Sequence, residues 1–75
     1  MNLDLFSTRL RALREQRKLT LQSVGAAIGR TRHTIGNLEN GRKSPSADML
    51  IALADFYGVS LDYLTGRTDK PEINR

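Results

Sequence analysis

Residues 24–39 constrain the fold of this chain more than any other segment. They contain two short runs with helical spacing of apolar residues, and Gly29 separates the runs. Val24 and Ile28 lie four residues apart in the first run, and the second run has the same kind of spacing. A glycine between two such runs is typical of a left-handed helix stop. The sequence therefore predicts two short helices joined by a tight turn.

Capping residues and glycines divide the remaining chain into helices. Asp4 is expected to cap a first helix whose inner side carries Phe6, Leu10 and Leu13. The expected outer face of this helix consists of Arg9, Arg11, Glu15 and Gln16. The expected caps of the next four helices are Thr20, Thr31, Ser46 and Ser60, and the expected stops are Gly29, Gly41, Gly58 and Gly66.

No segment has the alternating pattern of a strand, so the predicted fold class is all-α. We expect one compact five-helix domain over residues 1–66, in which the second and third helices form a helix-turn-helix. Residues 67–75 are polar, contain Pro71 and show no periodicity, which predicts a flexible tail. A chain of 75 residues is close to the lower limit for a domain that folds without disulfides or metals.

The composition argues against several classes of protein. The chain has no cysteine and one histidine, so neither disulfides nor a metal site are expected. It has no apolar run of membrane-spanning length and no signal-peptide pattern, which predicts a cytoplasmic protein without membrane contact. It also lacks paired acids and a glycine-rich phosphate loop after a strand. We therefore expect no enzyme activity, no cofactor and no small-molecule ligand.

The charge of the chain is unevenly distributed. Residues 1–43 contain nine Lys or Arg and three acidic residues, a net charge of +6, whereas residues 44–75 have a net charge of −2. A basic pole of this kind is suited to a polyanion such as DNA. Ordinary scatter of surface charge is the alternative explanation.

The third helix, at about residues 31–40, carries polar side chains on its outer face that can read base edges in a major groove. Arg32 can bridge the two acceptors of guanine, and Asn37 can pair with adenine. His33 can make one hydrogen bond, and Thr34 can touch a thymine methyl group or a phosphate. Gly36 would remove bulk where the helix lies closest to the groove floor. A solvated polar face is the alternative. The residues expected to contact phosphates are Gln22, Arg30, Thr31, Asn40, Arg42 and Lys43.

In residues 19–46, and more loosely over residues 6–66, the chain resembles the phage repressor and Cro-like helix-turn-helix regulators, the XRE family. The resemblance is carried in order by Thr20, Gly29, the runs 31–35 and 38–42, Pro45-Ser46 and the run 58–64. Two positions depart from the family pattern. Leu21 stands where similar proteins usually have a DNA-anchoring Gln, which Gln22 can replace, and Arg30 stands where an apolar residue is common.

The resemblance implies a sequence-specific transcriptional regulator, most simply a dimeric repressor on an inverted repeat in double-stranded DNA. It also implies a structural ion pair between Glu39 and Arg14 of the first helix. The expected dimer contacts are Val59, Leu61, Tyr63 and Leu64, which could equally close the core. The alternative function is an antitoxin or another regulator that binds a protein partner.

Overall fold

Five helices make up the structure, a computed structural model that describes residues 1–73. They are α1 (Leu3–Gln16), α2 (Leu21–Ala27), α3 (Arg32–Glu39), α4 (Ala47–Tyr57) and α5 (Leu61–Thr65). No strand occurs within residues 1–73, and the predicted all-α fold with five helices is confirmed. No helix in this part of the chain has both the length and the apolar character needed to cross a membrane.

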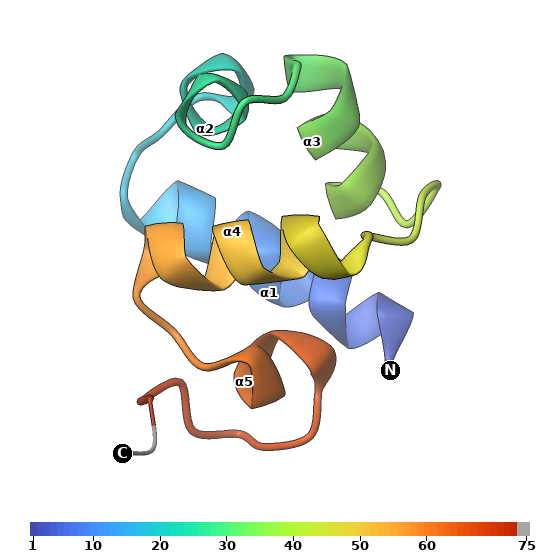
Figure 1. Cartoon of the computed structure of the whole chain (residues 1–75), viewed down its shortest axis with the longest axis vertical. Coiled ribbons are helices and arrows are strands. Elements are labelled where there is room, and N and C mark those ends of the chain that lie inside the picture. The colour runs from blue at the N-terminus through green and yellow to red at the C-terminus, as the bar shows by residue number, and fades with distance from the viewer. Residues whose placement is uncertain (74–75) are drawn as a thin grey trace.

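The helices are arranged around a central pair formed by α1 and α4. Figure 1 shows α2 and α3 together at one end of the molecule and α5 at the other, with α4 crossing α1 between them. α3 contacts both α2 and α1, whereas α5 contacts α1 and α4. The helix-turn-helix is therefore held at one end of the domain, away from α5 and the C-terminal segment.

Local capping defines four of the five helix starts as the sequence predicts. The side chains of Thr20, Thr31, Ser46 and Ser60 each accept a hydrogen bond from a backbone N–H in the first turn of their helix. The predicted cap of α1 is wrong. Asn2 caps this helix by accepting a hydrogen bond from the Leu5 N–H. Asp4 lies inside the first turn, where the helix dipole stabilises a negative charge.

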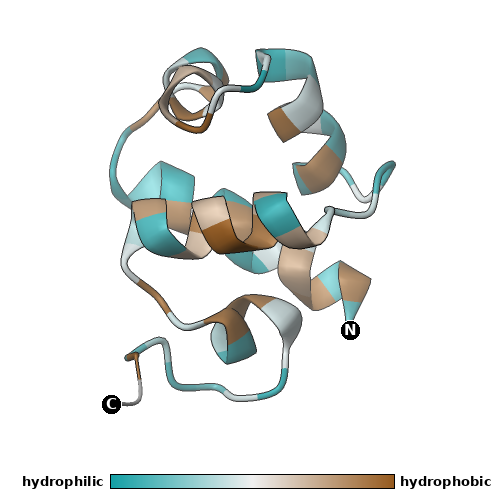
Figure 2. Ribbon diagram, in the orientation of Figure 1, coloured by the Kyte–Doolittle hydropathy of each residue, from teal (hydrophilic) through white to brown (hydrophobic). Residues whose placement is uncertain are grey.

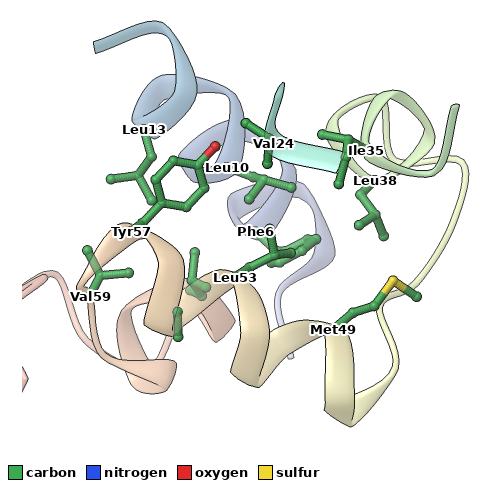
Figure 3. Packing of buried hydrophobic residues seen from close by; sticks show 12 residues of the cluster. Phe6, Leu10, Leu13, Val24, Ile35, Leu38, Met49, Leu53, Tyr57 and Val59 are labelled. Carbon is green, nitrogen blue, oxygen red and sulfur yellow. The ribbon is translucent and has the colours of Figure 1, made fainter. Parts of the chain in front are cut away.

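A single apolar core joins the helices. The brown, apolar parts of the ribbons turn largely toward the interior in Figure 2. Phe6 and Leu10 of α1 lie opposite Leu53 of α4, and Val24, Ile35 and Leu38 reach the same cluster from α2 and α3 (Figure 3). All six of these side chains are fully buried. The helix-turn-helix is thus anchored by apolar contacts from both of its helices.

Tyr57 brings a polar atom into this core. Its side chain is 3% exposed, and its hydroxyl group has no hydrogen-bond partner within residues 1–73. Burial, together with the nearby negative charge of Glu39, raises the pKa of Tyr57 to about 12. The phenol ring fills the core, while its hydroxyl group adds a desolvation cost that no partner offsets.

Arg9 is buried, although the sequence places it on the outer face of α1; that prediction is wrong. Its guanidinium group stacks 4.0 Å from the centre of the Tyr63 ring. The same group donates hydrogen bonds to the carbonyl oxygens of Tyr63 and Thr68 and contacts the Asp69 carboxylate at 3.0 Å. A cation with these partners can be buried because its donors are satisfied.

These contacts hold the first part of the segment that the sequence predicts to be a tail. The Ser60 N–H also donates a hydrogen bond of 2.9 Å to the Pro71 carbonyl oxygen, so the segment runs back past the start of α5. The structure describes the segment as far as Ile73, and residues 74–75 of the predicted tail lie outside the described residues. The flexibility of residues 67–75 in solution stays a prediction.

Replacing Arg9 by Met should lower the free energy of unfolding by about 1–3 kcal/mol, because carbonyl groups lose their donor. Asp69→Ala is the matched control. The Asp69 side chain is 99% exposed, so its loss should leave the melting temperature unchanged. Thermal melts of the two variants measure the difference, and equal losses would contradict the role given to the buried guanidinium group.

Tyr57→Phe should leave the stability at pH 7 unchanged or slightly higher, because it removes a buried hydroxyl group without a partner. The pKa of Tyr57 is near 12 in the folded state and near 10 in the unfolded state. The folded state therefore favours the protonated form of Tyr57. The stability linked to this protonation is complete below about pH 10 and is lost as the pH rises toward 12. Denaturant melts between pH 9 and 11.5 should show a smaller alkaline loss for the variant than for the wild type. Parallel losses would contradict this assignment.

Candidate nucleic-acid interface

The turn between α2 and α3 depends on two glycines. Gly29 has a φ of +71°, the left-handed conformation that the sequence predicts for the stop after α2. Gly25 lies against the backbone of the turn, since a Cβ atom there would lie 2.8 Å from the carbonyl oxygen of Arg30. Gly25 thus admits the backbone of the turn. The Arg30 N–H donates a hydrogen bond of 2.7 Å to the Gly25 carbonyl oxygen and closes the turn.

The outer face of α3 contains an open hollow. Three of the four residues predicted to read bases line it, namely Arg32, His33 and Asn37. Its other lining residues are Leu21, Gly36, Asn40 and Arg42. The structure thus brings side chains from α2, α3 and the following loop to one surface, at the end of the molecule that carries the helix-turn-helix (Figure 1).

Thr34, the fourth predicted base-reading residue, lies apart from the hollow. Its hydroxyl group is 3.2 Å from that of Thr31, and its N–H donates to the same Thr31 oxygen. Both threonines therefore take part in the start of α3. Their contact with DNA stays a prediction, with Thr31 at a helix N-terminus where backbone N–H groups favour an anion.

The remaining residues predicted to contact phosphates are exposed. They are Gln22, Arg30, Asn40, Arg42 and Lys43. Within the described part of the chain, the guanidinium groups of Arg32 and Arg42 have no hydrogen bond or ion pair to another residue. Two uncompensated cations therefore border the hollow, which gives this surface a positive potential that favours a polyanion.

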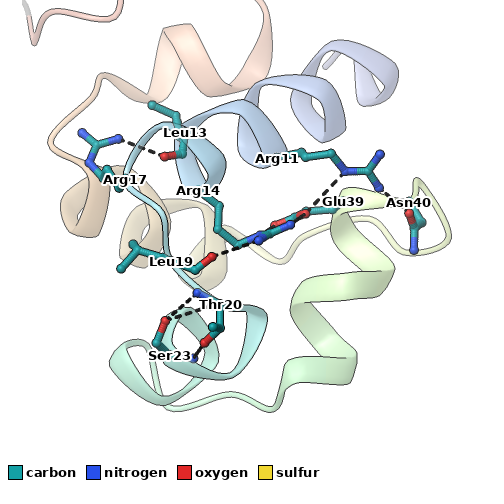
Figure 4. A network of polar contacts seen from close by, with 9 residues as sticks. All are labelled: Arg11, Leu13, Arg14, Arg17, Leu19, Thr20, Ser23, Glu39 and Asn40. Carbon is teal, nitrogen blue, oxygen red and sulfur yellow. Dashed lines mark hydrogen bonds and ion pairs between the residues drawn. The ribbon is translucent and has the colours of Figure 1, made fainter.

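An ion-pair network joins this surface to the core. Glu39 at the end of α3 is 6% exposed, and its carboxylate receives two hydrogen bonds from Arg14, of 2.8 and 3.0 Å. This is the ion pair that the family resemblance implies. Hydrogen bonding to Glu39 raises the pKa of Arg14, so the guanidinium group stays charged. Arg14 also donates to the Leu19 carbonyl oxygen at 3.0 Å, which ties the pair to the chain just before α2 (Figure 4).

Arg11 extends the network to the candidate interface, and sequence reasoning missed this role. Its guanidinium group lies 3.6 Å from the Glu39 carboxylate and donates a hydrogen bond of 2.6 Å to the side-chain oxygen of Asn40 (Figure 4). With its oxygen held in this way, the Asn40 amide group keeps its N–H donors for a phosphate. Arg11 and Asn40 are 29 residues apart in the sequence, so no local pattern indicates this contact.

The four residues predicted as dimer contacts lie in three different environments. Val59 and Leu64 are buried in the core, with exposures of 6% and 0%, and close it as the alternative explanation expects. Tyr63 lies partly buried beneath Arg9. Leu61 is exposed and lines an apolar groove with Met1, Leu50 and Ile51 at the α4–α5 end of the domain.

The fold and this surface define a helix-turn-helix protein, and comparison with known proteins agrees. The family model described as a helix-turn-helix domain matches residues 5–65. The chain belongs to this family.

Relatives of the chain carry names of transcriptional regulators. The uncharacterized HTH-type transcriptional regulator YobD of Bacillus subtilis (strain 168) is 40% identical over 68 residues, which are 91% of this chain and 61% of that protein. The cryptic phage CTXphi transcriptional repressor RstR of Vibrio cholerae is 34% identical over 65 residues, 87% of this chain and 59% of that protein. The chain thus spans about three fifths of the length of these relatives.

A solved structure has the same fold. The crystal structure of the P22 c2 repressor protein in complex with synthetic operator 9T matches with a TM-score of 0.77 and 30% sequence identity. The match covers 80% of this chain and 91% of that one. The helix-turn-helix architecture predicted from the sequence is therefore confirmed.

Glu39→Gln should lower the free energy of unfolding by about 3 kcal/mol, because it leaves the Arg14 charge without its partner near the core. For a domain of this size the melting temperature should fall by more than about 10 °C. Glu15→Gln is the control, since Glu15 is an exposed acid on α1. A wild-type melting temperature for Glu39→Gln would contradict a structural role for the pair.

Proposed function

We propose that this chain is a sequence-specific, double-stranded DNA-binding transcriptional repressor that reads the major groove with α3. The observation that carries the proposal is the hollow on α3, which Arg32, His33 and the half-buried Asn37 line together. Family membership supports it, as do the relative named a transcriptional repressor and the neighbour solved with a synthetic operator.

The residues of this surface divide by the chemistry of what they can contact. Arg32 and Asn37 have the bidentate groups that distinguish guanine and adenine in the major groove, and His33 adds one hydrogen bond. Arg42, Lys43 and the Arg11–Asn40 pair supply charge and N–H donors at the edge of the same surface, which suits the phosphate backbone. Phosphate contacts position α3, and base contacts select the sequence.

We further propose that two copies bind an inverted repeat, with half-sites about 34 Å apart, because one recognition helix reads few base pairs. Of the residues considered for the dimer surface, Leu61 is available in the monomer and lies in the apolar groove with Met1 and Ile51. Val59 and Leu64 act through the core, where they hold α5 in place.

Enrichment of binding sites from a random duplex pool, at about physiological salt, tests the proposal. An enriched inverted repeat is the expected result. Folded protein that enriches no sequence would overturn the repressor proposal and favour a regulator that binds a protein partner.

On the enriched site, Arg32→Ala and Arg42→Ala should have different effects. Arg32→Ala should relax the preference at one base position, at a cost of about 1–3 kcal/mol. Arg42→Ala should weaken binding to every sequence alike and reduce the salt dependence of log Kd by about one unit. Titrations on the site and on scrambled DNA at several salt concentrations measure both. Equal losses on all sequences for both variants would contradict the division between base and phosphate contacts.

A further inference from the structure

Gly36 lies in the middle of α3, where glycine is a poor helix former. The fold does not require it there. Its φ is not positive, and a Cβ atom at this position would meet only the Leu21 Cδ1 atom, at 3.8 Å, which is an ordinary van der Waals contact. Alanine would therefore fit the protein and strengthen the helix. The glycine keeps open a space on the outer face of α3.

Leu21 of α2 borders this space. It is partly buried against the core, yet its side chain also lines the hollow on α3. Leu21 and Gly36 are the two residues of that hollow without a polar side chain, and the other lining residues are Arg32, His33, Asn37, Asn40 and Arg42. The surface predicted to face DNA thus has a small apolar recess surrounded by polar and cationic groups.

We propose that the recess between Leu21 and Gly36 receives the 5-methyl group of a pyrimidine, which is thymine in unmodified DNA. The inference rests on the proposed function. The C5-methyl group is the apolar group that base pairs present in the major groove, and the other groups there are hydrogen-bond donors or acceptors. A polar base edge placed against Leu21 would lose its hydration without a partner, whereas a methyl group gains from leaving water.

The polar residues of the hollow favour the same occupant. The guanidinium groups of Arg32 and Arg42, which have no partner among the described residues, attract the DNA phosphates and base acceptors next to the recess. Because Gly36 has no side chain, the helix backbone can approach the base edge closely enough for a methyl group to reach Leu21. The recess would then select for a methyl group at one position of the half-site, next to bases read by Arg32 and Asn37.

The experiment uses the enriched DNA site and base analogues that differ by the methyl group alone. Each thymine of the half-site is replaced in turn by uracil, by cytosine and by 5-methylcytosine. At one thymine position, replacement by uracil should weaken binding of the protein about fourfold, because one methyl group is no longer buried. Uracil in the sequence flanking the half-site is the control and should have no effect.

Cytosine and 5-methylcytosine at that same position distinguish the two sources of the methyl group. If 5-methylcytosine binds more tightly than cytosine, the recess accepts either methylated pyrimidine. If the two bind alike while thymine exceeds uracil, thymine is the occupant. Specific binding with no difference between thymine and uracil at any position would overturn this inference and leave the proposed function standing. Absence of any specific binding would overturn both.

Gly36→Ala gives a second, independent test. The added methyl group should fill the recess, so the variant should bind the thymine and uracil sites equally and both more weakly than the wild type binds thymine. Its melting temperature should rise by roughly 4–8 °C, because alanine stabilises the helix. A variant that is more stable and still distinguishes thymine from uracil by the wild-type factor would overturn the inference.

Discussion

The buried carboxylate of Glu39 is the interaction on which the candidate interface depends. It lies at the end of α3 and is 6% exposed. Two nitrogens of the Arg14 guanidinium group donate hydrogen bonds to its two oxygens. A buried charge of this kind is tolerated only with a partner in good geometry, so the pair fixes where α3 ends relative to α1. Because Arg14 also binds the Leu19 carbonyl oxygen, the same pair restrains the entry to α2.

This anchoring has a consequence for binding. If α3 reads DNA as proposed, a helix that is already fixed loses little conformational freedom on binding, and less of the interaction energy is then spent on ordering it. The apolar contacts of Val24, Ile35 and Leu38 hold the inner side of the helix-turn-helix, while Glu39 holds its end. The outer face is left to side chains such as Arg32 and Arg42, which have no partner within residues 1–73 and remain available to a polyanion.

At the opposite end of the domain, Arg9 has a comparable role. It joins α1 to α5 and to the segment that follows, through its contacts with Tyr63 and Thr68. The two arginines, Arg9 and Arg14, are on the same helix, yet each brings together parts of the chain that are distant in sequence. α1 is therefore the element that connects the candidate DNA surface to the C-terminal part of the domain.

The sequence by itself determined the features that depend on neighbouring residues. Thr20, Thr31, Ser46 and Ser60 cap helices because their side chains reach a backbone N–H three residues away. Apolar spacing likewise determined the inner faces, and thereby placed Arg32, His33 and Asn37 outside. The start of α1 was predicted wrongly, because Asn2 and Asp4 are both competent caps and periodicity does not choose between them.

The tertiary structure alone decided the features that depend on distant residues. Arg9 is buried because Tyr63 and Thr68, 54 and 59 residues away, supply a ring and carbonyl oxygens. Leu21 and Gly36 form a recess because the turn at Gly29 folds α2 against α3. Local patterns report whether a side chain can be buried or exposed, whereas its partner is set by how the helices pack. That packing turned a row of polar residues on α3 into a surface with a specific shape.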